Sequence, residues 1–319
     1  MSQASTSEQM PEASCDFSLL TVPLELAREQ VGHMVSGNRA KLDHISPLQS
    51  VFAGNDQAVG FLFAAAQELG LPREVPHLAL SFFDSVMRVE MGACLTLSEA
   101  GREVQLVRLH NVVLLRLLGC LQIAAKGSSQ HHLVEQDDAR RILETQGRLA
   151  VTKEELVANE LRILQLLRFR TMPILPSHIF DALLAILVAT GLVEKEMANT
   201  FHELGLELAD LTAQRRASIY RIAISSSTGS REEEVSRQQI GFVSADDMLL
   251  ATGLVCTCSY LLQSSEAADQ IAEELESVSH VGAQDTAELS GAIFSQLQGQ
   301  VAVLRQKYAA TAGLETMGS

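Results

Sequence analysis

Apolar residues recur every three or four positions along most of this chain, a spacing that gathers them on one face of an α-helix. In residues 49–69, Val59, Leu62 and Ala66 share such a face, and Gly70 ends the pattern. The two-residue alternation typical of strands is missing, so the pattern predicts an all-α protein. We expect helices over residues 22–37, 49–69, 73–91, 107–126, 137–146, 152–167, 177–189, 194–212, 245–263, 267–280 and 286–307.

The segment 107–126 is apolar around most of its helical circumference, unlike the one-sided helices on either side of it. A helix that is apolar on all sides is normally surrounded by other helices. We therefore predict that it forms the centre of a five-helix bundle. Its apolar residues are Leu109, Val112, Val113, Leu115, Leu117, Leu118, Leu121 and Ile123.

The fifth expected helix begins with a capping signal. Thr152 and Glu155 match the S/T-x-x-E capping box, in which each side chain bonds the backbone N–H of the other residue. The sequence therefore predicts a helix start at Thr152. We expect its buried stripe to consist of Leu156, Leu161, Leu164 and Leu167.

Prolines and polar stretches divide the chain into parts. Pro173 and Pro176 interrupt the helical pattern, and a second helical set follows them. The Ser-rich, charged segment 225–241 is expected to be a polar loop. We predict an N-terminal tail with a short helix, a five-helix bundle and a second helical domain, at residues 1–44, 45–172 and 173–319.

The acidic charge of the chain argues against two classes of binding partner. The formal net charge is −15, and no Lys or Arg occurs between Arg237 and Arg305. An acidic surface repels phosphate backbones and anionic lipid, so we expect neither direct nucleic-acid binding nor membrane binding. The acidic residues of this stretch form either a solvated face or a docking face for a basic partner.

The chain offers no pattern that is diagnostic of catalysis. Phosphate-binding glycine motifs are missing, and His131, His132 and His178 have no partner at a characteristic spacing. Cys256 and Cys258 are too close together for ordinary zinc spacing. We expect an intracellular, non-enzymatic protein without a cofactor, a metal or a small-molecule ligand.

Three stretches in order resemble the cyclin family. VGFLFAAAQELGLPREVPHLALSFFDSVM (residues 59–87) resembles the first two helices of a cyclin box. LQIAAK (121–126) is similar to the end of its third helix, and VTKEELVANELRILQLLRFR (151–170) to its fifth. The resemblance implies a cyclin fold, with a five-helix cyclin box followed by a second, divergent helical repeat. Residues 248–263 and the helix after them look like those of a meiotic, crossover-associated branch of the family.

The resemblance points to two functional residues. In cyclins, a Lys that closes the third helix and a Glu on the fifth helix face a cyclin-dependent kinase, and Lys126 and Glu160 match these positions. Two interpretations stay open. The pair contacts a protein partner, or it forms only an internal salt bridge between its own two helices.

The chain also departs from the family. Ser128 and Ser129 stand where typical cyclins carry two acidic residues. In the second helix, Asp84 matches an Asp of the family, but the Arg that usually follows it is replaced by Ser85. The apolar substrate-docking patch is replaced by polar residues, so we expect that docking site to be lost. The aligned residues are Gly54, Asn55, Asp56, Gln57 and Ala58, with Phe61 at the position of the usual Trp.

Three functions are compatible with the resemblance. The first is a nuclear, non-catalytic interaction module on meiotic chromosomes that promotes crossover maturation in recombination and chiasma formation, through contacts with recombination factors. The second is a regulatory subunit that binds and activates a cyclin-dependent kinase. The third, a nucleic-acid-binding cyclin fold of the general transcription factor type, needs a basic face that the acidic composition does not favour.

Overall fold

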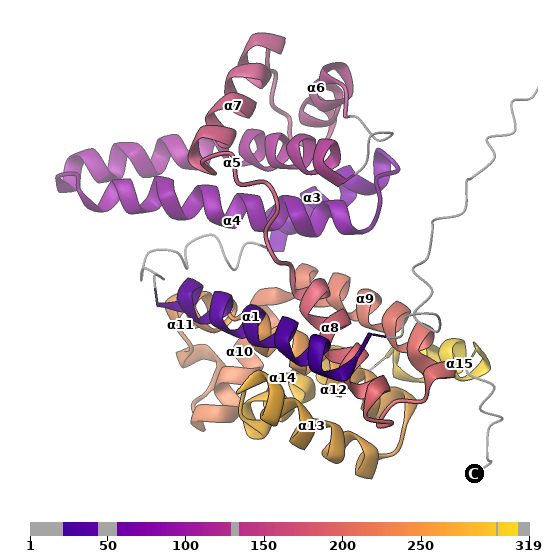
Figure 1. The fold of residues 1–319 in the computed structure, drawn as a ribbon. Coiled ribbons are helices and arrows are strands. Elements are labelled where there is room, and N and C mark those ends of the chain that lie inside the picture. The colour runs from indigo at the N-terminus through magenta and orange to yellow at the C-terminus, as the bar shows by residue number, and fades with distance from the viewer. Residues whose placement is uncertain (1–21, 44–55, 129–133, 298, 312–319) are drawn as a thin grey trace, which may run out of the picture.

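The computed structural model describes residues 22–43, 56–128, 134–297 and 299–311. Fourteen α-helices and two short 3₁₀ helices account for the secondary structure of these residues, and none of them forms a strand. The predicted all-α class is therefore confirmed. Figure 1 shows two groups of helices, one above the other.

The upper group contains five helices. They are α3 (Asp56–Glu68), α4 (Glu74–Leu95), α5 (Glu99–Ser128), α6 (Gln136–Thr145) and α7 (Lys153–Leu166). Helix α5 contacts all four of the others, as predicted for the central helix. Its C-terminal half is almost wholly buried, because Leu117, Leu118 and Leu121 are all 0% exposed. These helices enclose one continuous apolar core.

The lower group encloses a second apolar core. Its helices are α8 (Pro176–Ala189), η3 (Lys195–Met197), α9 (Ala198–Gln214), α10 (Arg216–Thr228), η4 (Glu232–Glu234), α11 (Arg237–Val243), α12 (Asp247–Leu262), α13 (Ser265–Ser279), α14 (Ala283–Gln296) and α15 (Val301–Thr311). Helix α12 packs against α8, α9, α13 and α14, so it occupies the centre of this group as α5 does of the other.

Helix α1 (Leu24–Leu42) precedes the upper group in sequence but packs on the lower one. Its buried residues Ala27, Val31 and Met34 belong to the second core. The Lys41 ammonium lies 2.5 Å from the Asp247 carboxylate at the start of α12. The N-terminal helix is therefore a structural part of the C-terminal group, a contact between distant segments that helical periodicity does not reveal.

Ion pairs join the two groups of helices. Asp210 on α9 lies 2.5 Å from the Arg73 guanidinium and 2.6 Å from the His77 ring. On the same side of α4, the Arg216 guanidinium donates to Asp84 at 3.1 Å and also to the Ser244 carbonyl oxygen. Asp84, the Asp in the second helix of the cyclin-like stretch, thus accepts a hydrogen bond from the lower group of helices.

Two expected elements differ in the structure. Much of the segment 225–241 is helical, because α10 continues to Thr228 and α11 begins at Arg237. The serine-rich composition favoured a loop, but the Thr228 hydroxyl bonds the Ile224 carbonyl oxygen at 2.8 Å within the helix. The single helix expected over 286–307 is two helices, α14 and α15, separated by a turn that contains Gly299.

Candidate protein-interaction surface

Lys126 and Glu160 lie together at the edge of the upper group. Lys126 is in the last turn of α5, and its Nζ donates to Glu160 Oε1 on α7 at 2.6 Å. The Lys126 side chain remains 44% exposed and that of Glu160 is 21% exposed. The structure therefore contains the internal salt bridge that the sequence allowed, and it leaves part of both charges open to a partner.

A buried polar network holds α5 and α7 in this register. Glu90 on α4 is 7% exposed and accepts from the Arg116 guanidinium at 3.1 Å. Arg116 also donates to Asn159 on α7, and the Asn159 amide donates to the Leu115 carbonyl oxygen at 2.8 Å. A Cβ at Gly119 would collide with the Asn159 amide, so glycine permits this close approach. Because Asn159 directly precedes Glu160, the network fixes where Glu160 emerges.

The capping box at the start of α7 is confirmed. The Glu155 N–H donates to Thr152 Oγ1 at 3.1 Å, and the Thr152 N–H donates to Glu155 Oε2 at 2.8 Å. These bonds satisfy two backbone donors that would otherwise lack partners at the helix start.

The predicted buried stripe of α7 is wrong at one position. Leu161 is 51% exposed, whereas Asn159 and Ile163 are buried. The true stripe runs through Leu156, Asn159 and Ile163 at three- and four-residue spacing. The sequence prediction counted only apolar residues and therefore missed Asn159, whose burial depends on the polar network with Arg116.

Two exposed apolar side chains lie beside Glu160 on α7. Val157 and Leu161 are about one helical turn or less from Glu160 on α7, and they are 50% and 51% exposed. Beyond the end of α7, Phe169 is 65% exposed and Met172 is 94% exposed. We call the Lys126–Glu160 pair together with Val157 and Leu161 the rim surface. Its mixture of apolar contact area and charged hydrogen-bonding groups is typical of protein interfaces.

The chain after α7 adopts a rare backbone conformation. Arg168 and Phe169 have φ angles of 52° and 57°, in the left-handed region that favours glycine. The Phe169 N–H donates to the Leu164 carbonyl oxygen at 2.9 Å, which closes the helix end. Strained, non-glycine positions cluster at functional sites, so this exposed phenylalanine is a candidate contact residue.

Helix α3, the first helix of the cyclin-like stretch, offers no apolar docking patch among its described residues. Asp56 and Gln57 are exposed and polar, while Ala58 is buried in the core. Gly54 and Asn55, which complete the aligned patch, lie outside the described residues. Phe61 packs partly against the core. The described part of the patch thus lacks the groove that an apolar peptide would need.

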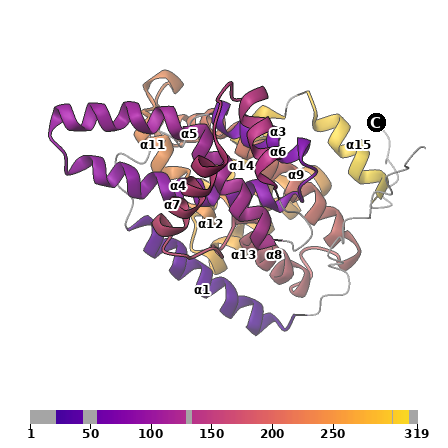
Figure 2. The same ribbon diagram turned by 90° about the horizontal axis from the view of Figure 1, so that it is seen from above.

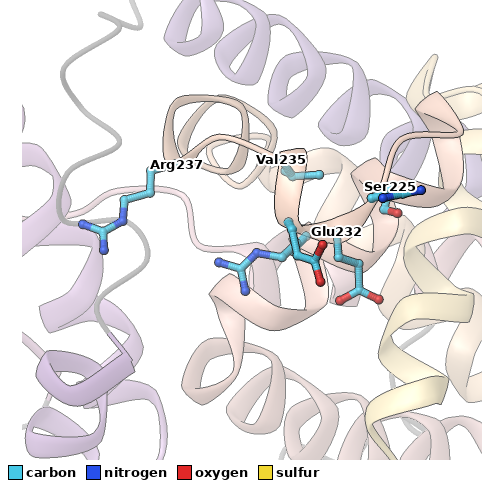
Figure 3. Close-up of a pocket in the computed structure, with 7 residues that line it drawn as sticks. Ser225, Glu232, Val235 and Arg237 are labelled. Atoms are coloured by element: carbon cyan, nitrogen blue, oxygen red, sulfur yellow. The ribbon is translucent and has the colours of Figure 1, made fainter.

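A surface pocket lies in the lower group, between α10, η4 and α11 (Figure 3). Its lining residues are Arg221, Ser225, Arg231, Glu232, Glu233, Val235 and Arg237. Figure 3 shows that Arg237 points away from Glu232 and Ser225. Acid–base or nucleophilic catalysis requires charged groups that converge on one point. The charged groups of this pocket do not converge in this way.

The exposed face of α13 carries an acidic stripe. Glu266, Asp269, Glu273 and Glu276 follow one another at three- and four-residue spacing and are all exposed. Asp269 accepts from the Tyr260 hydroxyl at 3.2 Å. Both interpretations of this acidic region, a solvated face and a docking face, stay open.

Two further properties bear on the class of protein. Within the described parts of the chain, no three His, Cys, Asp or Glu side chains form a group that could hold a metal ion. Helix α5 is long and apolar enough to cross a membrane by length and composition, but half of its apolar window is buried inside the protein. That burial is what the central helix of a bundle requires.

No protein-family model matches the sequence. The chain is similar to the mouse protein "Cyclin N-terminal domain-containing protein 1", with 26% identity over 298 residues that cover 89% of this chain and 87% of the relative. It is similar to the human protein of the same name, with 27% identity over 294 residues that cover 88% of this chain and 87% of the relative. These relatives confirm the predicted resemblance to the cyclin family and, with the all-helical structure, the cyclin fold.

Proposed function

We propose, on the premise that this chain is a cyclin-like protein, that it is a non-catalytic interaction module that promotes crossover maturation during meiotic recombination. Its place of action in this proposal is the nucleus, on meiotic chromosomes. The sequence of residues 248–263 and of the helix after them supports the meiotic branch of the family. The likeness to the two relatives extends over most of both chains, so it includes this second half.

The rim surface is the observation that carries the interaction role. It combines a charged pair that is partly exposed with apolar side chains that are half exposed or more. Charged hydrogen bonds contribute about 1.5–3 kcal/mol each, and apolar contact supplies the remaining affinity. The polar start of α3 argues against docking of apolar substrate peptides there. The structure thus favours partner binding at α5 and α7 over binding at α3.

The meiotic role is tested by deleting the gene in germ cells and counting late crossover foci and chiasmata. We expect their number to fall while early recombination foci still form. Restoring the intact gene should return the count to normal, and a variant with Phe169→Ala and Leu161→Asp should restore fewer foci. Normal crossover numbers in the deletion would contradict the proposal.

The second candidate is a regulatory subunit that binds and activates a cyclin-dependent kinase. It is supported by the position of Lys126 and Glu160, which match the kinase-facing pair of cyclins. We expect Lys126→Glu or Glu160→Lys to reduce the amount of kinase that co-purifies with the chain, by tenfold or more if about 1.4 kcal/mol is lost. Co-purification that neither change affects would remove this candidate.

A further inference from the structure

The chain that joins the two groups of helices carries exposed apolar side chains. We call residues 168–174 the connecting segment, and Figure 1 shows that it leads from α7 in the upper group to α8 in the lower group. Phe169 is 65% exposed, Met172 is 94% exposed and Ile174 is 47% exposed. None of the three belongs to either apolar core. The connecting segment therefore presents apolar surface that the described helices do not cover.

The exposure of the connecting segment alternates along the chain. Arg170, Met172 and Ile174 are exposed, whereas Thr171 and Pro173 between them are partly buried. A two-residue period is that of an extended chain with one face toward solvent. The backbone N–H groups of residues 171, 172 and 174 donate no hydrogen bond to a described residue. Both the outer side chains and these backbone donors are thus available to a ligand.

The connecting segment is also a cationic spot on an acidic molecule. No Asp or Glu occurs between Glu160 and Asp181, although the whole chain has a formal net charge of −15. Arg168 and Arg170 are exposed, and neither guanidinium forms an ion pair with a described residue. Two unpaired guanidinium groups beside exposed apolar side chains favour a ligand that combines negative charge with apolar groups.

We propose that the connecting segment binds an acidic segment of another protein in which carboxylate and apolar side chains lie close together. Arg168 and Arg170 bond the carboxylates, because a guanidinium can donate two parallel hydrogen bonds to one carboxylate. Phe169 and Met172 contact the apolar side chains, and the unbranched Met172 adapts to their shape. The proposal rests on the interaction role proposed above and adds a second surface with a partner of defined chemistry.

Two other occupants fit this surface less well. A nucleic acid is held through many phosphate contacts, and the acidic charge of the whole chain repels it. The acidic stripe on α13 of a second copy would supply carboxylates, but every exposed residue of α13 is polar. It therefore offers nothing to Phe169 and Met172. Negative charge and apolar groups together favour a different protein.

Fluorescence anisotropy with the full chain tests the chemistry of the ligand. The probe is a short fluorescein-labelled peptide that repeats Glu-Leu-Asp-Gly. One control peptide has Ser in place of Leu, and another has Lys in place of both acidic residues. We expect the probe to bind at concentrations up to about 1 mM, and each control peptide to bind about tenfold more weakly or not at all. Lack of probe binding, or equal binding of either control peptide, would overturn the proposal.

Matched variants test the place of binding. Arg170→Glu and Met172→Glu should each weaken probe binding by about tenfold or more, since each puts a carboxylate where the ligand carries its own. Arg237→Glu and Val303→Glu make the same changes at exposed positions on α11 and α15, and they should leave binding unchanged. Thermal unfolding should be the same for all four variants. Probe binding that Arg170→Glu and Met172→Glu leave intact would place the site elsewhere and overturn the proposal.

Two further measurements address the other occupants. Sedimentation of the chain alone should show no self-association that Arg170→Glu abolishes, and a single-stranded DNA oligonucleotide should bind more weakly than the probe at the same salt concentration. The opposite result in either measurement would overturn the proposal. These outcomes are separate from the proposed meiotic role. A germ-line deletion that lowers crossover foci, in a chain that does not bind the probe, would refute only the connecting-segment site.

Discussion

Both halves of α5 carry apolar side chains, but the two halves differ in how far these side chains are buried. Most side chains of residues 112–128, which we call the core half, are buried. Residues 99–111, which we call the tip half, carry Val104 and Val107 at more than 50% exposure. The helix is continuous, and its tip half projects together with the end of α4 past α6 and α7 (Figures 1 and 2). Leu118 is therefore enclosed in the core half, whereas Val104 and Val107 in the tip half remain exposed.

The largest expected contrast concerns charge. Arg116 in the core half is 13% exposed and pairs with Glu90, which is 7% exposed. Arg116→Ala would leave a buried carboxylate without its main partner, which costs about 3–5 kcal/mol. Chemical denaturation of the full chain measures this loss. Arg108→Ala in the tip half is the control, and we expect it to change the free energy of unfolding by less than about 0.5 kcal/mol.

A loss of less than about 0.5 kcal/mol for Arg116→Ala would contradict the structural role of the network, since surface changes are usually of that size. Arg162 lies 3.9 Å from Glu90 and could retain part of the stabilisation. A double variant that also replaces Arg162 separates these two contributions.

The second contrast concerns apolar packing. Leu118→Ala in the core half removes a side chain that is 0% exposed and should lower the free energy of unfolding by about 2–5 kcal/mol. Val107→Ala in the tip half should cost less than about 0.5 kcal/mol, because Val107 is 57% exposed. Thermal and denaturant unfolding followed by circular dichroism measure both variants. Equal losses would mean that the tip half is covered in solution by its own chain.

The third contrast concerns the helix that covers the core half. Thr152→Ala removes one side of the capping box of α7 and should cost about 0.5–2 kcal/mol. Hydrogen exchange should rise first in the N–H groups of the opening turn of α7. Thr96→Ala near the hairpin tip is the control, because that hydroxyl bonds only the nearby Ala93 carbonyl oxygen. Unchanged exchange in Thr152→Ala would show that the cap is dispensable.

Local signals in the sequence predicted much of the upper group. The capping box at Thr152 and the central position of α5 follow from spacing and apolar content alone, and the structure has both. The helix expected over residues 107–126 begins at Glu99 in the structure, so most of the tip half was not predicted to be helical. Its helicity depends on pairing with α4, which is a tertiary contact.

The candidate site was predictable only in part. The Lys126–Glu160 salt bridge is one of the two interpretations that the sequence left open, and contact with a partner stays a prediction. The contributions of Asn159 and Arg116 were missed, because polar residues in a helix normally predict a solvated face. The close approach of Asn159 depends on Gly119, whose importance appears only when α5 and α7 are placed together.

The central claim is that a partner binds the rim surface through Lys126 and Glu160, and a charge swap tests it most directly. The single variants Lys126→Glu and Glu160→Lys each place like charges together, so either could act by loosening α5 from α7. The double variant, with both changes, restores an internal salt bridge with reversed polarity. We predict that it melts within a few degrees of the unmodified chain but fails to recover the partners that affinity purification retrieves from meiotic tissue. Full recovery of those partners by the double variant would show that the pair serves only the fold and would contradict the claim.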